Sequence, residues 1–147
     1  MKIFGKKESM TQIFDDRGTV RPVTVVVADP ADLAVGDLVA VSGLAKGKGF
    51  QGVVKRHGFH GGPRSHGQKH SEREPGAIGG GGGRAGGRVA KGIRMAGRMG
   101  GQRVTVRNLK VVALDKEASQ ILISGAVPGR RGTKLELKRL QTNKATS

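Results

Sequence analysis

The stretch from Arg56 to Gly101 constrains the fold of this chain more than any other feature. Only six of its 46 residues are large aliphatics, Met or Phe, and Gly, Arg, Lys and His make up most of the rest. Ordering one residue costs roughly 1–2 kcal/mol of backbone entropy, which so few apolar side chains, at about 1.5–3 kcal/mol each, cannot offset. We therefore expect this segment not to fold on itself, and to become ordered on an anionic partner such as RNA.

The charge of the chain is large and unevenly distributed. The net charge is +16 at pH 7, and residues 44–110 hold 15 Lys and Arg against two acidic residues. A field of one sign attracts polyanions, and basic residues gathered in one part of a chain are typical of nucleic-acid-binding proteins. The absence of cysteine excludes disulfides and thiolate chemistry. With no signal peptide and no apolar run of about 18 residues, we expect a cytoplasmic protein without membrane contact.

Outside the glycine-rich stretch, segments rich in β-branched residues alternate with turn signals, which predicts short strands. The expected strands are residues 11–14, 19–28, 38–42, 50–55, 104–114, 121–124 and 135–137. The turn residues of Asp15–Gly18 predict a hairpin, and a change of apolar phase near Asn108 predicts a bulge or a bend. No segment has a helical apolar period over ten or more residues.

These strands predict a mainly β fold, a small barrel or sandwich that carries a long excursion. We expect residues 1–55 and 102–140 to form the β-barrel together, residues 56–101 to form an extended loop that penetrates RNA, and residues 141–147 to form a flexible tail.

Two motifs suggest other functions but have the wrong context. Residues 47–52 match G-x-G-x-x-G, yet β-like and glycine-rich sequence follows where a dinucleotide-binding motif needs a helix. Close approach of the backbone to RNA phosphate explains these glycines better. His57, His60, His66 and His70 could bind zinc, but without cysteines or an ordered scaffold we favour contacts with nucleic acid or solvent. Because no rigid catalytic triad can be assembled, we expect no enzyme activity, metal, cofactor or small-molecule substrate.

The predicted RNA-binding side chains are the cations and histidines of the extension, of its flanks and of one later turn. They are Lys46, Lys48, Lys55, Arg56, His57, His60, Arg64, His66, Lys69, His70, Arg73, Arg84, Arg88, Lys91, Arg94, Arg98, Arg103, Arg107, Lys110, Arg130 and Arg131. The chain has four Phe and neither Tyr nor Trp. This composition favours arginine and backbone contacts to folded RNA over stacking on many aromatic platforms.

Several blocks of the chain, in the correct order, resemble the large-subunit ribosomal protein L3 family of the bacterial type. They are residues 5–14 (GKKESMTQIF), 46–59 (KGKGFQGVVKRHGF), 61–67 (GGPRSHG), 75–79 (PGAIG), 95–100 (MAGRMG), 104–109 (VTVRNL) and 125–129 (GAVPG). The resemblance implies a translation-protein-type β-barrel with an extension threaded into 23S-type rRNA toward the peptidyl transferase centre. It also implies early subunit assembly, with large-subunit rRNA and neighbouring large-subunit ribosomal proteins as partners.

The chain departs from the pattern of that family at three places. Ser9 stands where the family usually has glycine, and residues 79–87 are mostly glycine where the family has a polar loop tip. The connection between Ala28 and Val35 is short where the family usually carries a partly helical insertion, so we expect a compact variant. The alternatives are a free-standing RNA chaperone and, with less support, an enzyme that acts on RNA.

Overall fold

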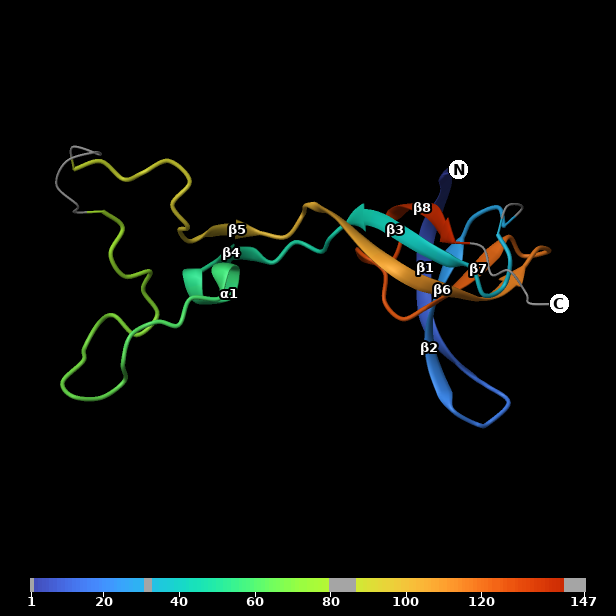
Figure 1. Ribbon diagram of the computed structural model, residues 1–147, viewed down its shortest axis with the longest axis horizontal. Helices are drawn as coiled ribbons and strands as arrows, with labels where there is room; N and C mark the ends of the chain where they lie inside the picture. Colours follow the sequence, from blue (N-terminus) through green and yellow to red (C-terminus); the bar gives the residue numbers. More distant parts are fainter. Residues whose placement is uncertain (1, 31–32, 80–86, 142–147) are drawn as a thin grey trace. The chain divides into compact units, whose positions relative to one another are not determined.

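The computed structural model describes residues 2–30, 33–79 and 87–141, and it divides into two compact units. Residues 1–46 and 101–147 form the first unit, and residues 47–100 form the second. The first unit contains β1 (Lys2–Phe14), β2 (Val20–Val27), β3 (Leu38–Leu44), β6 (Arg103–Asp115), β7 (Gln120–Ser124) and β8 (Lys134–Gln141). The second unit contains β4 (Gly49–Gln51), the helix α1 (Val53–His57) and β5 (Gly97–Met99) (Figure 1). The predicted mainly β fold class is confirmed.

The six strands of the first unit pair in the cyclic order β1-β2-β7-β6-β3-β8, and all of these pairs are antiparallel. The long strand β1 pairs with two strands in succession. Its residues 2–6 pair with β8, and its residues 6–14 pair with β2. Each strand therefore has a partner on both of its edges over at least part of its length, and this pairing closes the ring. Figure 1 shows the far end of the β1–β2 hairpin projecting from the other strands.

The barrel encloses an apolar core, and β7 and β8 show the two-residue burial period of strands with one buried face. In β7, Ile121 and Ile123 are fully buried, whereas Leu122 between them is only partly buried. The core cluster consists of Val26, Ala28, Leu33, Val39, Val41, Val111, Ile121, Ile123, Val127, Leu135 and Leu137. Among the described residues of the second unit, only Val53 is buried. The first unit therefore holds the hydrophobic burial that stabilises the fold.

The predicted bulge near Asn108 is confirmed. Val39 pairs with Leu109 and Val41 pairs with Val106, so two residues of β6 stand opposite the single residue between them in β3. Asn108 is one of these two and has a φ of 60°, which asparagine tolerates better than most residues. The extra residue changes the face to which the side chains of β6 point, which explains the change of apolar phase in the sequence.

The strand expected over residues 50–55 is wrong in its second half. Strand β4 ends at Gln51, and Val53 begins the short helix α1. The helix ends at Gly58, which has a φ of 73° and donates its N–H to the carbonyl of Val54. A left-handed glycine after the last turn is a strong helix stop. It outweighs the β preference of the two valines.

The boundary of the barrel also differs from the one expected from sequence. Residues 47–55 belong to the second unit, because β4 pairs with β5 and with no barrel strand. The expected flexible tail, residues 141–147, lies outside the described residues except for Gln141, the last residue of β8. Within the described residues, no helix has the length and apolar character to cross a membrane.

Lys7 is a buried cation that ties β1 to the turn between β7 and β8. Its Nζ donates hydrogen bonds to the carbonyls of Val127 and Gly129, both at 3.0 Å. Burial lowers the pKa of Lys7 from its ordinary value, and repulsion from Lys46 lowers it further. Lys7 also accepts a bond at its carbonyl from the N–H of Gly132, at 2.7 Å. These contacts hold the turn that carries Arg130 and Arg131.

A buried carboxylate orders the connection that leads into β3. Asp37 is fully buried, and its Oδ2 accepts the N–H of Ala34 at 3.0 Å and lies 2.9 Å from Nε of Arg139 on β8. A buried charge is costly unless it is paired and hydrogen-bonded, and this arrangement supplies both. The ion pair therefore joins the start of β3 to the end of β8.

We expect Lys7→Met to destabilise the barrel, because it keeps most of the apolar side chain but removes the donor to two carbonyls. The free energy of unfolding in urea should fall by about 1–3 kcal/mol. The matched control is Lys6→Met at the exposed neighbouring position, which should change it by less than about 0.5 kcal/mol. Equal stability of the two variants would contradict this role of Lys7.

The hairpin turn should respond to acid through Asp15. Its carboxylate accepts N–H groups of Thr19 and Arg17 and pairs with Arg21 at 2.8 Å. The Thr19 bond, followed by that of Arg21, lowers the pKa of Asp15 below its ordinary 3.8. Because the folded-state pKa is lowered, the ionised group stabilises the turn above pH 3.8, and this stabilisation disappears as the pH falls through the lowered value.

An NMR titration of the Gly18 and Thr19 amide shifts measures this effect. The midpoint should lie below pH 3.8 in the wild type, and the transition should vanish in Asp15→Asn but remain in Asp16→Asn. A midpoint at or above 3.8 would show that the turn does not favour the ionised carboxylate.

Candidate nucleic-acid interface

The second unit begins and ends in a two-stranded ribbon formed by β4 and β5. Phe50 pairs with Arg98 across the ribbon, and the N–H of Lys48 donates to the carbonyl of Met99 at 2.9 Å. Phe50 has 73% of its surface exposed, and the Arg98 side chain is also exposed. The ribbon therefore presents a phenyl ring and a guanidinium group, and both can lie flat against a base.

Arg56 and His57, both predicted to contact RNA, are engaged within the chain. Arg56 donates from Nη1 to the carbonyl of Met95 at 2.7 Å, and His57 Nε2 lies 3.0 Å from the same oxygen. Gly97 makes room for this contact, because a Cβ there would lie 2.6 Å from Arg56 Nη1. We call this contact of Arg56 and His57 with Met95 the clasp. It joins the outgoing and the returning segments of the second unit.

A closed loop follows, in which residues 61–62 run against residues 71–72. The N–H of Gly62 donates to the carbonyl of Glu72 at 3.0 Å, and Arg64 pairs with the Glu72 carboxylate at 2.6 Å. A Cβ at Gly62 would lie 2.7 Å from the carbonyl oxygen of Ser71, so only glycine fits without a shift. Glycine thus permits a backbone approach that a larger residue would prevent.

Most of the predicted RNA-binding side chains of the second unit are exposed. The exposed ones are Lys48, Lys55, His60, Arg64, His66, Lys69, His70, Arg73, Arg88, Lys91, Arg94 and Arg98, whereas Arg56 and His57 are half-buried. Arg84 lies outside the described residues. Among the described exposed cations of this unit, only Arg64 has a carboxylate partner, so the others can meet phosphate directly.

The barrel carries the remaining predicted cations, and one of them already has a carboxylate partner. The exposed ones are Lys46, Arg103, Arg107, Lys110, Arg130 and Arg131. Arg103 and Lys2 both pair with Glu136, and hydrogen bonds from Lys2 and then Arg103 lower the pKa of Glu136. Arg103 is therefore an internal ion-pair partner as well as a candidate for RNA contact.

Sequence reasoning missed two cations that the barrel places beside Arg130 and Arg131. A surface hollow of about 520 Å³ is lined by Lys6, Arg130, Arg131 and Lys134. Lys6 and Lys134 are far apart in the sequence and are direct partners in the β1–β8 pairing. No local pattern signals this group, because only strand pairing brings its members together. Four cations around one hollow favour an anion.

The four histidines do not form a metal centre in this structure. In residues 2–30, 33–79 and 87–141, no group of three or more His, Cys, Asp or Glu side chains is placed to hold a metal ion. His57 belongs to the clasp, and its ring lies 5.9 Å from that of Phe59. His66 is exposed and has a φ of 60°.

A small closed sheet and an almost coreless basic extension together define a protein whose surface is suited to a polyanion. The family model described as ribosomal protein L3 matches residues 19–122. The chain belongs to the ribosomal protein L3 family. Membership in a family of ribosomal proteins agrees with the expectation that the chain is not an enzyme.

Similar proteins carry the corresponding names. The chain is 56% identical over 97 residues to large ribosomal subunit protein uL3 of Herpetosiphon aurantiacus, covering 66% of this chain and 45% of that protein. It is 48% identical over 118 residues to protein uL3c of Guillardia theta, covering 78% and 56%. It is 36% identical over 197 residues to protein uL3 of Acidothermus cellulolyticus, covering 88% of each.

The chain spans about half the length of the first two of these relatives. The Acidothermus alignment covers 197 positions, whereas 88% of this 147-residue chain is about 129 residues. That relative therefore has about 68 residues within the aligned region for which this chain has no counterpart. A difference of this size agrees with the expectation of a compact variant.

The clasp predicts a local effect of removing the Arg56 guanidinium. In Arg56→Met, the amide of Lys48 in the β4–β5 ribbon should exchange about tenfold faster, because a hydrogen bond from a charged group contributes roughly 1.5 kcal/mol or more. Lys55→Met, at the exposed neighbouring position, is the control and should leave this rate unchanged. If both variants exchange alike, the ribbon does not depend on the clasp.

Proposed function

We propose that this chain is a structural constituent of the large ribosomal subunit that binds 23S-type rRNA. Membership in the L3 family and the charge of the second unit together support this proposal. Residues 47–100 hold 11 Lys and Arg against only Glu72 and Glu74. Because that unit buries almost nothing, its basic surface is available to a partner. Large-subunit rRNA is a polyanion with many folded grooves that an extended chain can enter.

In this proposal the two units have different tasks. The barrel has a core and holds the two ends of the extension, while the second unit enters the rRNA and reaches toward the peptidyl transferase centre. The hollow lined by Lys6, Arg130, Arg131 and Lys134 gives the barrel a phosphate contact of its own. Binding early in subunit assembly follows from this arrangement, because an extension surrounded by folded RNA must be in place before that RNA closes.

The partners that the proposal implies are large-subunit rRNA and neighbouring large-subunit ribosomal proteins, and the place of action is the ribosome. A free-standing RNA chaperone is the competing function, since the same charge would bind many polyanions with little preference. Sedimentation separates the two. The ribosomal protein should stay with large subunits after a high-salt wash, whereas a chaperone should be released into the top fractions of the gradient.

Affinity for large-subunit rRNA should depend steeply on salt. If roughly 6–10 cations contact phosphate, the binding constant should fall by about 10³–10⁵ between 50 and 200 mM salt, on the scale of duplex DNA. Filter binding measures this slope. Each of Lys69→Gln and Arg73→Gln should reduce the slope by about one.

The matched control is Arg17→Gln in the β1–β2 turn, because residues 11–22 contain two acidic and two basic residues and carry no net charge. This variant should leave the salt slope unchanged. A wild-type binding constant that hardly changes over the salt range would rule out the proposed mode of binding.

A further inference from the structure

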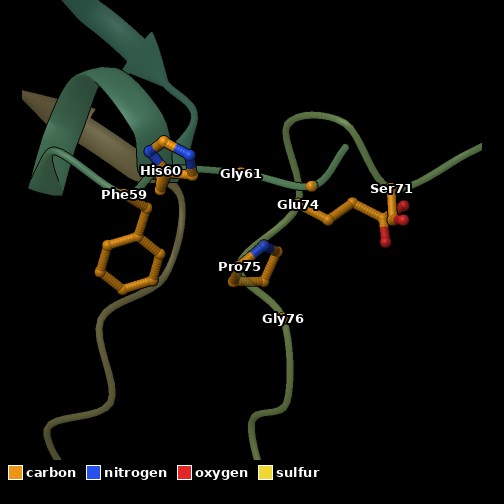
Figure 2. Close-up of a pocket in the computed structure, with 8 residues that line it drawn as sticks. Phe59, His60, Gly61, Ser71, Glu74, Pro75 and Gly76 are labelled. Carbon is orange, nitrogen blue, oxygen red and sulfur yellow. The ribbon is translucent and has the colours of Figure 1, made fainter. Parts of the chain in front are cut away.

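A pocket of about 420 Å³ lies inside the second unit, between the start of the closed loop and its end. Its lining includes Phe59 and His60 from one segment, and Ser71, Glu74 and Pro75 from the other. Figure 2 shows the Phe59 and Pro75 rings on opposite sides of the opening, with the Glu74 carboxylate near Ser71. The volume lies within the roughly 300–1,000 Å³ of ligand pockets.

We infer that this pocket takes one unstacked base of the rRNA. This inference rests on the proposed function and adds to it a specific kind of contact. Sequence composition alone predicts mainly phosphate contacts, because the chain has no Tyr, no Trp and only four Phe.

The walls of the pocket are held together although the unit has almost no core. Gly62 donates its N–H to the Glu72 carbonyl, and the Arg64–Glu72 ion pair lies beside this bond. Gly61 lies so close to the Glu72 backbone that any Cβ would overlap the carbonyl oxygen. These contacts hold the two segments at one spacing, so this part of residues 56–101 has local order that its composition did not predict. Preorganisation of this kind lowers the entropy cost of binding.

The Phe59 ring has a defined orientation. It lies 5.9 Å from the His57 ring at an interplanar angle of 42°, and His57 itself contacts the Met95 carbonyl. Phe59 is half-buried, whereas Phe4, Phe14 and Phe50 are each exposed by 66% or more. The clasp therefore positions an aromatic face at the pocket. Such a face is the platform on which an unstacked base binds.

The polar groups of the pocket favour a base over a phosphate. Glu74 offers a carboxylate, which only accepts hydrogen bonds when ionised, while the Ser71 hydroxyl and the His60 ring can donate or accept. A phosphate would be repelled by Glu74, whereas an exocyclic amino group can donate to it. The expected base is therefore adenine, cytosine or guanine. Lys69 and Arg73, each two residues from Ser71 in the sequence, have exposed side chains that can meet backbone phosphate.

The decisive variant is Phe59→Ala, tested by filter binding of the full chain to 23S-type rRNA at one salt concentration. Loss of one stacked base should weaken binding by about 5- to 150-fold. Phe14→Ala is the matched control, because Phe14 is an exposed phenylalanine on a hairpin of zero net charge, and it should change the affinity by less than about twofold. Phe59→Tyr keeps an aromatic face and should restore most of the binding.

The salt slope separates this inference from the proposed function. Stacking releases no counterions, so Phe59→Ala should lower the affinity without changing the slope of the binding constant with salt. The inference is overturned if Phe59→Ala binds like Phe14→Ala, or if it changes the slope. A defect of Phe59→Ala only in assembled particles, with normal binding to naked rRNA, assigns the pocket to a neighbouring protein and also overturns it. A flat wild-type slope contradicts the proposed function instead.

Amide exchange in the free Phe59→Ala variant shows whether weaker binding comes from a lost stacking contact or from a loss of structure in the loop. The Gly62 amide should exchange no faster than in the wild type, because its bond to Glu72 does not involve the Phe59 ring. If that protection is lost, the smaller change Phe59→Leu replaces Phe59→Ala in the same comparison. Leucine preserves apolar volume but provides no flat face, so its affinity should still fall by at least about fivefold.

Discussion

Closure of the six-stranded ring is the constraint on which the rest of the molecule depends. Because β8 pairs with both β1 and β3, it holds together strands that are far apart in the sequence. The same ring pairs Leu44 with Arg103, and the N–H of Ala45 donates to the Gln102 carbonyl at 2.8 Å. The two segments that lead into the second unit therefore leave the barrel as hydrogen-bonded neighbours. A long excursion is tolerable in a small domain when its ends are held in this way.

Within the second unit, side chains that look alike in the sequence have different tasks. Arg56 donates to the Met95 carbonyl and Arg64 pairs with Glu72, whereas Arg94 and Arg98 are exposed. Without a hydrophobic core, charged hydrogen bonds and close glycine contacts determine the local structure. A basic residue of this unit can thus be part of the support or part of the RNA-binding surface, and only its neighbours decide which.

Several features of the fold could be predicted because local chemistry controls them. The turn that begins at Asp15 forms because that carboxylate accepts nearby backbone N–H groups, and the bulge at Asn108 appears as a change of apolar phase. The strand expected to run to Lys55 was wrong. Val53 and Val54 favour a strand, but they lie in a short helix that the left-handed Gly58 ends. The barrel boundary was also misplaced. Strand β4 pairs with β5, which lies far from it in the sequence, and no local pattern signals this pairing.

The sequence by itself determined the mainly β class, the concentration of positive charge and the lack of core-forming residues between Arg56 and Gly101, because these follow from composition and short-range pattern. Tertiary structure alone decided that Lys6 and Lys134 share a hollow with Arg130 and Arg131, and that Phe59 faces a pocket beside Pro75. Both arrangements bring together segments that are separated in the sequence, and no repeating pattern of residues indicates that they meet. Their contacts arise only when strand pairing and close backbone approach bring those segments together, and such long-range pairing is not encoded in any local pattern of residues.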